Sequence, residues 1–101
     1  MRLETLDDVL LRIRMARTIR LVQTEKNRKT KYQLGLTDED LKDIVRGLQR
    51  CDYYKGPEGD HDGSTGNIWV FKKREYGEWF YIKLKYVEPI KALSCHIDNI
   101  E

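Results

Sequence analysis

The sequence is poor in cysteine, with only Cys51 and Cys95 among its 101 residues. Two thiols are too few for a disulfide scaffold, and they are not spaced like the ligands of a zinc knuckle. No apolar run approaches the roughly 20 residues of a membrane span, and the first residues lack the apolar stretch of a secretory signal. We therefore expect a cytoplasmic protein that uses no cofactor, no metal and no membrane.

A glycine-rich segment, Gly56–Gly66, invites a metal interpretation of its own. Asp60, His61 and Asp62 resemble the start of a cation-binding loop. The remaining ligands and the terminal glutamate of an EF-hand are missing, so we do not predict calcium binding. The density of turn-forming residues predicts a mobile loop instead.

The length suits one domain, which we place over residues 1–101. Two helices are predicted from capping threonines that precede apolar stripes: one after Thr5, and one after Thr37 with Leu41, Ile44, Val45 and Leu48 at helical spacing. Between them, Ile19 and Leu21 fit a short strand, and residues 23–33 fit a polar helix or a long loop.

The second half of the chain has the pattern of β-strands. They are predicted over Asp52–Lys55, Ile68–Lys73, Trp79–Val87 and Lys91–Ile97. Helices followed by strands predict an α+β fold, in which N-terminal helices pack on one face of an antiparallel sheet of three to five strands.

The central strand, Trp79–Val87, has one apolar and one cationic face. Alternate side chains point to opposite faces, so Phe80 and Ile82 enter the core, whereas Tyr81, Lys83 and Lys85 line an open face. In the last strand, Leu93, Cys95 and Ile97 are expected in the core, with Ser94 and His96 on the open face. This pairing puts His96 opposite Tyr81, or one diagonal step away.

The open face thus gathers groups that could cleave RNA, and Lys55 lies at the end of the neighbouring strand. Attack by a 2'-hydroxyl needs a base, an acid for the leaving oxygen, and positive charge near the phosphate. His96 is the candidate acid or base because its charge changes near neutral pH. Lys55 and Lys83 could supply charge, and Tyr81 could orient groups or relay a proton.

The order of several short motifs resembles the MqsR family of toxins, which belong to the RelE-like mRNA interferases. The motifs are Leu34-Gly35-Leu36, Gly47-Leu48, Asp52-Tyr53-Tyr54-Lys55, Ile68-Trp69, Val70-Phe71, Phe80-Tyr81-Ile82-Lys83 and Ser94-Cys95-His96, covering roughly residues 34–97. The resemblance implies an mRNA endoribonuclease with Lys55, Tyr81 and His96 in the site. It also implies a cognate antitoxin and makes the ribosome a further candidate partner. Val70 stands where a polar glutamine is expected, and it cannot orient a phosphate or a base.

Basic residues are concentrated between Arg12 and Lys31, a segment that holds a single acid, Glu25. Such a stretch attracts polyanions. We predict RNA contacts at Arg14, Arg17, Arg20, Lys72 and Lys85. An alternative of another class remains open: a non-catalytic module that binds RNA or protein through the Arg12–Lys31 surface.

Overall fold

A computed structural model describes residues 5–59 and 67–100. Its helices are α1 (Leu6–Met15), α2 (Glu25–Leu34) and α3 (Asp38–Arg46), and a 3-10 turn, η1, covers Arg50–Asp52. Its strands are β1 (Ile19–Leu21), β2 (Tyr53–Glu58), β3 (Ile68–Glu75), β4 (Glu78–Lys85) and β5 (Ile90–Ile97). The predicted α+β class is confirmed.

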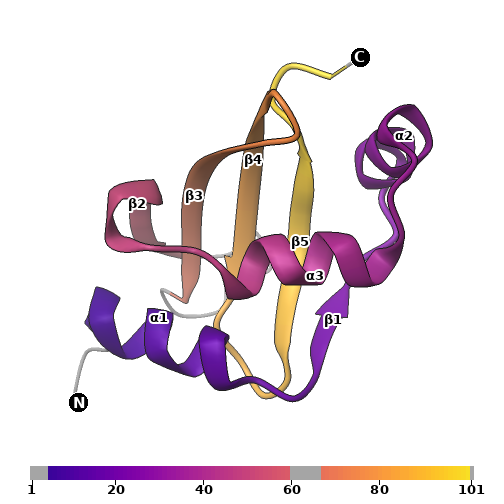
Figure 1. Ribbon diagram of the computed structural model, residues 1–101. Coiled ribbons are helices and arrows are strands. Elements are labelled where there is room, and N and C mark those ends of the chain that lie inside the picture. The colour runs from indigo at the N-terminus through magenta and orange to yellow at the C-terminus, as the bar shows by residue number, and fades with distance from the viewer. Residues whose placement is uncertain (1–4, 60–66, 101) are drawn as a thin grey trace.

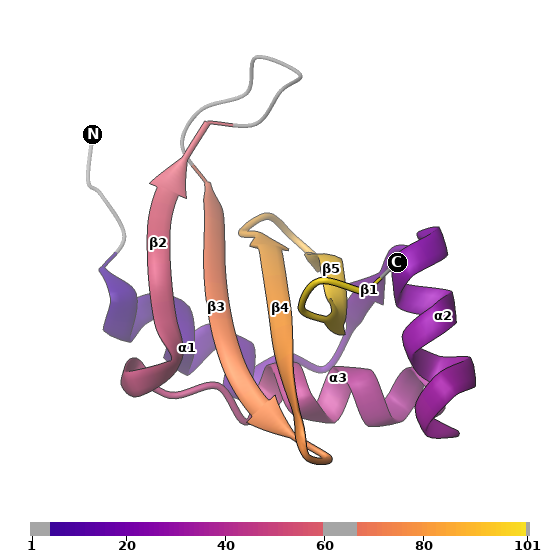
Figure 2. The same ribbon diagram turned by 90° about the horizontal axis from the view of Figure 1, so that it is seen from above.

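The five strands form one sheet in the order β1-β5-β4-β3-β2. Strand β1 runs parallel to β5, and the other pairs are antiparallel. Helices α1 and α3 lie together on one face of the sheet, whereas α2 stands beside β5 at the sheet edge (Figures 1 and 2). The prediction of helices packed on one face of the sheet is confirmed by α1 and α3.

The two predicted helix starts are confirmed, with Thr5 and Thr37 as the N-cap residues. The Thr5 hydroxyl accepts a hydrogen bond from the Asp8 amide, the Thr37 hydroxyl accepts one from the Asp40 amide, and each carboxylate bonds back to its threonine amide. These capping boxes satisfy amide groups that have no partner inside the helix. Buried side chains of both helices then join the sheet in one core.

Helix α2 forms although it has no apolar stripe. The Thr24 hydroxyl caps its first turn by accepting from the Asn27 amide at 3.1 Å, and Gly35 ends it in the left-handed conformation with φ 67°. Its fully buried side chains are polar ones, Asn27 and Thr30. Of the two predictions for this segment, the polar helix is the correct one.

Strand β2 extends further than predicted, through Glu58, so the first residues of the predicted glycine-rich loop are strand. Gly56 makes this possible because a Cβ there would lie 2.6 Å from the Ile68 carbonyl oxygen, and its φ of 127° is unfavourable for other residues. Close approach of the two backbones thus requires glycine. The Asp60-His61-Asp62 motif lies outside the described residues.

The expected alternation in β5 holds from Ser94 to Ile97 but is wrong for Leu93 and Ala92. Lys83 pairs with Ser94 but Leu84 pairs with Ala92, so Leu93 is an extra residue in a bulge. An extra residue exchanges the faces of all residues beyond it. Ala92 is therefore fully buried in the core in place of Leu93, whereas Cys95 and Ile97 are buried as expected.

Burial separates the two cysteines. Cys51 is exposed and Cys95 is buried, and burial raises the pKa of the Cys95 thiol to about 12. Cys95 is thus a packing residue of the core. In the part of the chain that the structure describes, no helix combines the length and apolarity needed to cross a bilayer.

Candidate active site

The face of the sheet opposite α1 and α3 carries the predicted catalytic residues. Phe80 and Ile82 of β4 point into the core, so Tyr81 and Lys83 point to the side of the sheet away from α1 and α3, here called the open face. The register places His96 directly opposite Tyr81 and Ser94 opposite Lys83. The predicted pairing of Tyr81 with His96 is confirmed.

The rings of Tyr81 and His96 are stacked. Their centroids lie 5.6 Å apart with an interplanar angle of 24°, and His96 is only 7% exposed. The Nδ1 atom of His96 lies 2.9 Å from the Ile97 carbonyl oxygen. A carbonyl can only accept, so Nδ1 carries the proton and Nε2 is left as the nitrogen that can exchange protons.

Helix α2 holds the strand that carries His96. The Oδ1 atom of Asn27 accepts from the Cys95 amide at 2.9 Å, and the Thr30 hydroxyl accepts from the Ile97 amide at 3.0 Å. Cys95 and Ile97 are the two residues that flank His96. The Nδ2 group of Asn27 also donates to the Val22 carbonyl at 2.7 Å. Side chains of a helix thus satisfy a strand edge that another strand would otherwise pair.

A depression beside the stacked rings provides room for a ligand. It is lined by Tyr81, Lys83, Ser94, His96, Asp98 and Asn99 of the sheet side and by Thr24, Glu25 and Lys26 at the start of α2. The helix start therefore forms one wall of the candidate site. Of the predicted catalytic residues, three line this depression.

Lys55, the fourth, lies further across the sheet. It pairs with Val70, which in turn pairs with Lys83, and its ammonium group lies 3.5 Å from Glu58. Val70 is fully buried although it belongs to the open face. The position where a polar residue was expected is therefore occupied by a buried apolar side chain, between Lys55 and Lys83.

Lys72 is held on the open face beside Tyr81. It pairs with Tyr81 in register, lies 4.5 Å from the Tyr54 ring centroid and forms an ion pair with Asp98 at 3.3 Å. An ammonium over a tyrosine ring gains cation–π attraction. Lys72 is thus well placed near the stacked rings, with its charge partly balanced by Asp98.

A row of cations crosses the open face at the other end of β4. Lys85 pairs with Lys91, and Lys91 pairs with Arg20 of β1. Ile19 and Leu21 join the core, so Arg20 points to the open side. None of the ion pairs among the described residues involves Arg20 or Lys91. This row, Lys85–Lys91–Arg20, is here called the cationic row.

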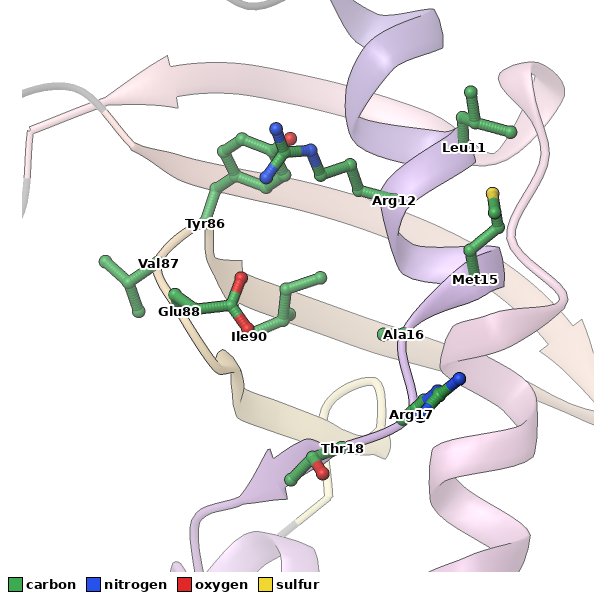
Figure 3. Close-up of a pocket in the computed structure, with 10 residues that line it drawn as sticks. All are labelled: Leu11, Arg12, Met15, Ala16, Arg17, Thr18, Tyr86, Val87, Glu88 and Ile90. Atoms are coloured by element: carbon green, nitrogen blue, oxygen red, sulfur yellow. The ribbon is translucent and has the colours of Figure 1, made fainter.

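Arg14 and Arg17 lie away from these groups. Arg14 is on α1, which packs against the core face, and it lines a hollow next to Arg50. Arg17 lines a second hollow, between the end of α1 and the β4–β5 turn, together with Met15 and Tyr86 (Figure 3). Of the five predicted RNA contacts, the open face collects Arg20, Lys72 and Lys85.

One family model matches most of the chain. The family model described as "Motility quorum-sensing regulator, toxin of MqsA" matches residues 3–96. The chain belongs to the MqsR toxin family. The match begins well before residue 34, so it includes the first helix and confirms the family expected from the motifs. The description implies a cognate antitoxin, MqsA. Comparisons with curated proteins and with solved structures gave no match.

Sequence reasoning missed two parts of this candidate site. The sequence does not indicate that Asn27 and Thr30 are buried, because polar residues on a polar helix are usually exposed to solvent. Only the position of the β5 edge shows that they accept hydrogen bonds from its amides. Lys91 was missed because only the β1–β5 pairing aligns it with Arg20. Among the described residues, no three His, Cys, Asp or Glu side chains form a group suited to a metal ion.

Proposed function

We propose that this MqsR-family toxin is an endoribonuclease that cleaves mRNA by attack of a 2'-hydroxyl on the adjacent phosphate. The observation that carries the proposal is the stacked Tyr81–His96 pair, which shares the open face with Lys83. An acid-base group, a phenol that can relay a proton and a cation line one depression, and these groups suit this chemistry.

The reaction uses the chain's own residues. A base removes the 2'-hydroxyl proton, the 2'-oxygen bonds to phosphorus, the bond to the 5'-oxygen breaks, and that oxygen receives a proton. His96 acts as the acid or the base through Nε2, since Nδ1 is held by the Ile97 carbonyl, and the Tyr81 hydroxyl relays the other proton. Lys83 and Lys55 oppose the extra negative charge of the transition state, and Tyr81 holds the imidazole and orients the phosphate.

Cleavage should persist in EDTA and leave a 2',3'-cyclic phosphate. The nucleophile is the substrate's own hydroxyl, so no metal-activated water is needed. The purified protein is incubated with RNA, with and without EDTA, and the fragment ends are analysed. An otherwise identical oligonucleotide with a 2'-deoxy sugar at the cut site is the control and should resist. Loss of activity in EDTA, or cleavage of the deoxy substrate, would contradict the mechanism.

The toxin role has its own test in cells. Expression of the protein alone should stop growth, and co-expression of its cognate antitoxin should restore it. Tyr81→Phe is the matched control, because it removes one oxygen from the site and leaves the ring stack in place. Normal growth with high levels of folded wild-type protein would count against the proposal.

The alternative, a non-catalytic binding module, differs from the nuclease proposal in the arginines that would bind RNA. If RNA lies on the open face, replacing Arg20 and Lys91 by glutamine removes two phosphate contacts. The slope of log K (K, the association constant) against log[salt] should then become shallower by about 1.4. Replacing Arg14 and Arg17 by glutamine is the matched control and should change little. Binding is measured over a salt series with an uncleavable 2'-O-methyl oligonucleotide.

The opposite outcome would favour the module. If the Arg14 and Arg17 substitutions abolish binding while those at Arg20 and Lys91 do not, the nucleic acid or partner lies on the α1 side. Such a protein would bind RNA without cutting it, and the Tyr81 and His96 variants would behave as wild type.

A further inference from the structure

Trp79 is exposed to solvent on the same strand face as Tyr81. It is 53% exposed, and it lies two residues before Tyr81 in β4, so both side chains point to the open face. The other tryptophan, Trp69, is only 4% exposed and belongs to the core. The fold therefore buries one indole and leaves the other next to the candidate catalytic pair.

The backbone at Trp79 is well anchored. Its carbonyl accepts a hydrogen bond from the Asp98 amide at 2.7 Å, which ties β4 to the residue after β5. The Asp98 carboxylate in turn pairs with Lys72 at 3.3 Å. Arg74 of β3 stands opposite Trp79 in register. The exposed ring is thus carried by a strand that is hydrogen-bonded on this side to Asp98, and Arg74 stands opposite it in the sheet.

These surroundings favour a nucleic acid base as the ligand of the indole. Every base has an aromatic face, and stacking on a protein side chain does not depend on sequence. RNA-binding sheets present exposed aromatic residues to unpaired bases in this way. Arg74 stands opposite Trp79 in register, and its positive charge suits a ligand that carries a phosphate beside each base.

We propose that Trp79 stacks against an unpaired base of the RNA, next to the phosphate that is cleaved at Tyr81 and His96. The inference rests on the proposed function for the position of the cut, but the binding of single-stranded RNA is separable from it. It assigns the strand face a base-binding subsite in addition to its catalytic groups. The ligand class is single-stranded RNA, because a paired base is already stacked on its neighbours.

The two tryptophans allow a direct measurement. Intrinsic fluorescence is recorded while a single-stranded 2'-O-methyl oligonucleotide, which cannot be cleaved, is added to the full-length protein. The wild type should be quenched, Trp69→Phe should keep the quench, and Trp79→Leu should lose it. Affinity should fall about 5- to 150-fold in Trp79→Leu, the range for loss of one stacked base.

A second variant and a second ligand keep the test decisive. Trp79→Tyr preserves an aromatic face and should retain most of the affinity, even if Trp79→Leu were poorly folded. Equal affinity of wild type, Trp79→Tyr and Trp79→Leu would overturn the proposal. So would quenching by the antitoxin with none by the oligonucleotide, because Trp79 would then be a protein contact.

The result also separates this inference from the proposed function. If the oligonucleotide quenches Trp79 but natural RNA is never cut, the base-binding subsite stands and the nuclease proposal fails. If RNA is cut and the oligonucleotide binds without affecting Trp79, the nuclease proposal stands and the subsite is wrong.

Discussion

His96→Ala should slow RNA cleavage by about 10²- to 10⁴-fold, the usual contribution of a positioned acid-base group. The imidazole supplies the Nε2 atom that exchanges protons, and the hydrogen bond from Nδ1 to the Ile97 carbonyl fixes its orientation. Tyr81→Phe should also slow the chemical step, although the stack with His96 remains. Binding of an uncleavable 2'-O-methyl oligonucleotide should weaken far less than the rate.

Single-turnover rates and dissociation constants measured side by side separate the two effects. Lys83→Ala should impair both, because its charge acts on the bound phosphate as well as on the transition state. Met15→Ala is the control, since Met15 is 71% exposed on α1, on the other side of the sheet. Full activity in His96→Ala would remove the mechanism, and Lys55 would become the next candidate for proton transfer.

Asn27→Ala should lower the free energy of unfolding by about 1–3 kcal/mol, the cost of leaving a buried polar group without its partner. Asn27 is fully buried, and its side chain bonds to the Cys95 amide and the Val22 carbonyl. The residues that flank His96 lose part of their support, so the cleavage rate should fall as well. Urea unfolding followed by far-UV circular dichroism measures the first effect.

Thr30 provides the matched pair of variants for the same strand edge. Thr30→Val keeps the shape of the side chain but leaves the Ile97 amide without its acceptor, whereas Thr30→Ser keeps the hydroxyl. Valine should therefore destabilise clearly more than serine. Gln33→Ala, at an exposed position of α2, should change stability by no more than about 0.5 kcal/mol. Equal stability of wild type and Asn27→Ala would show that water replaces the side chain at the strand edge.

Much of this architecture follows from local chemistry in the sequence. The capping threonines Thr5 and Thr37 determine where two helices begin, because the amides of a first turn need acceptors wherever the helix later packs. Alternation along β4 determines that Tyr81 and Lys83 share a face, since a strand has only two. The placement of His96 opposite Tyr81 follows from the same rule applied to β5.

Other features depend on contacts between residues far apart in the chain. The bulge at Leu93 exchanges the faces of β5, and no residue type at that position announces it. The parallel pairing of β1 with β5 brings Arg20 beside Lys91, whereas Arg14 lies on α1 and Arg17 lies beside the β4–β5 turn. Continuity of positive charge along a sequence therefore says little about continuity on a surface.

The polar helix α2 shows most clearly why tertiary structure was needed. Burial of Asn27 and Thr30 is favourable only because the edge of β5 offers amides in need of acceptors. In the sequence alone the same residues are typical of a solvated helix. The capping boxes and the two-residue alternation are thus determined within a few residues of chain, but the support of His96 arises only when α2 and β5, nearly 70 residues apart, meet at the sheet edge.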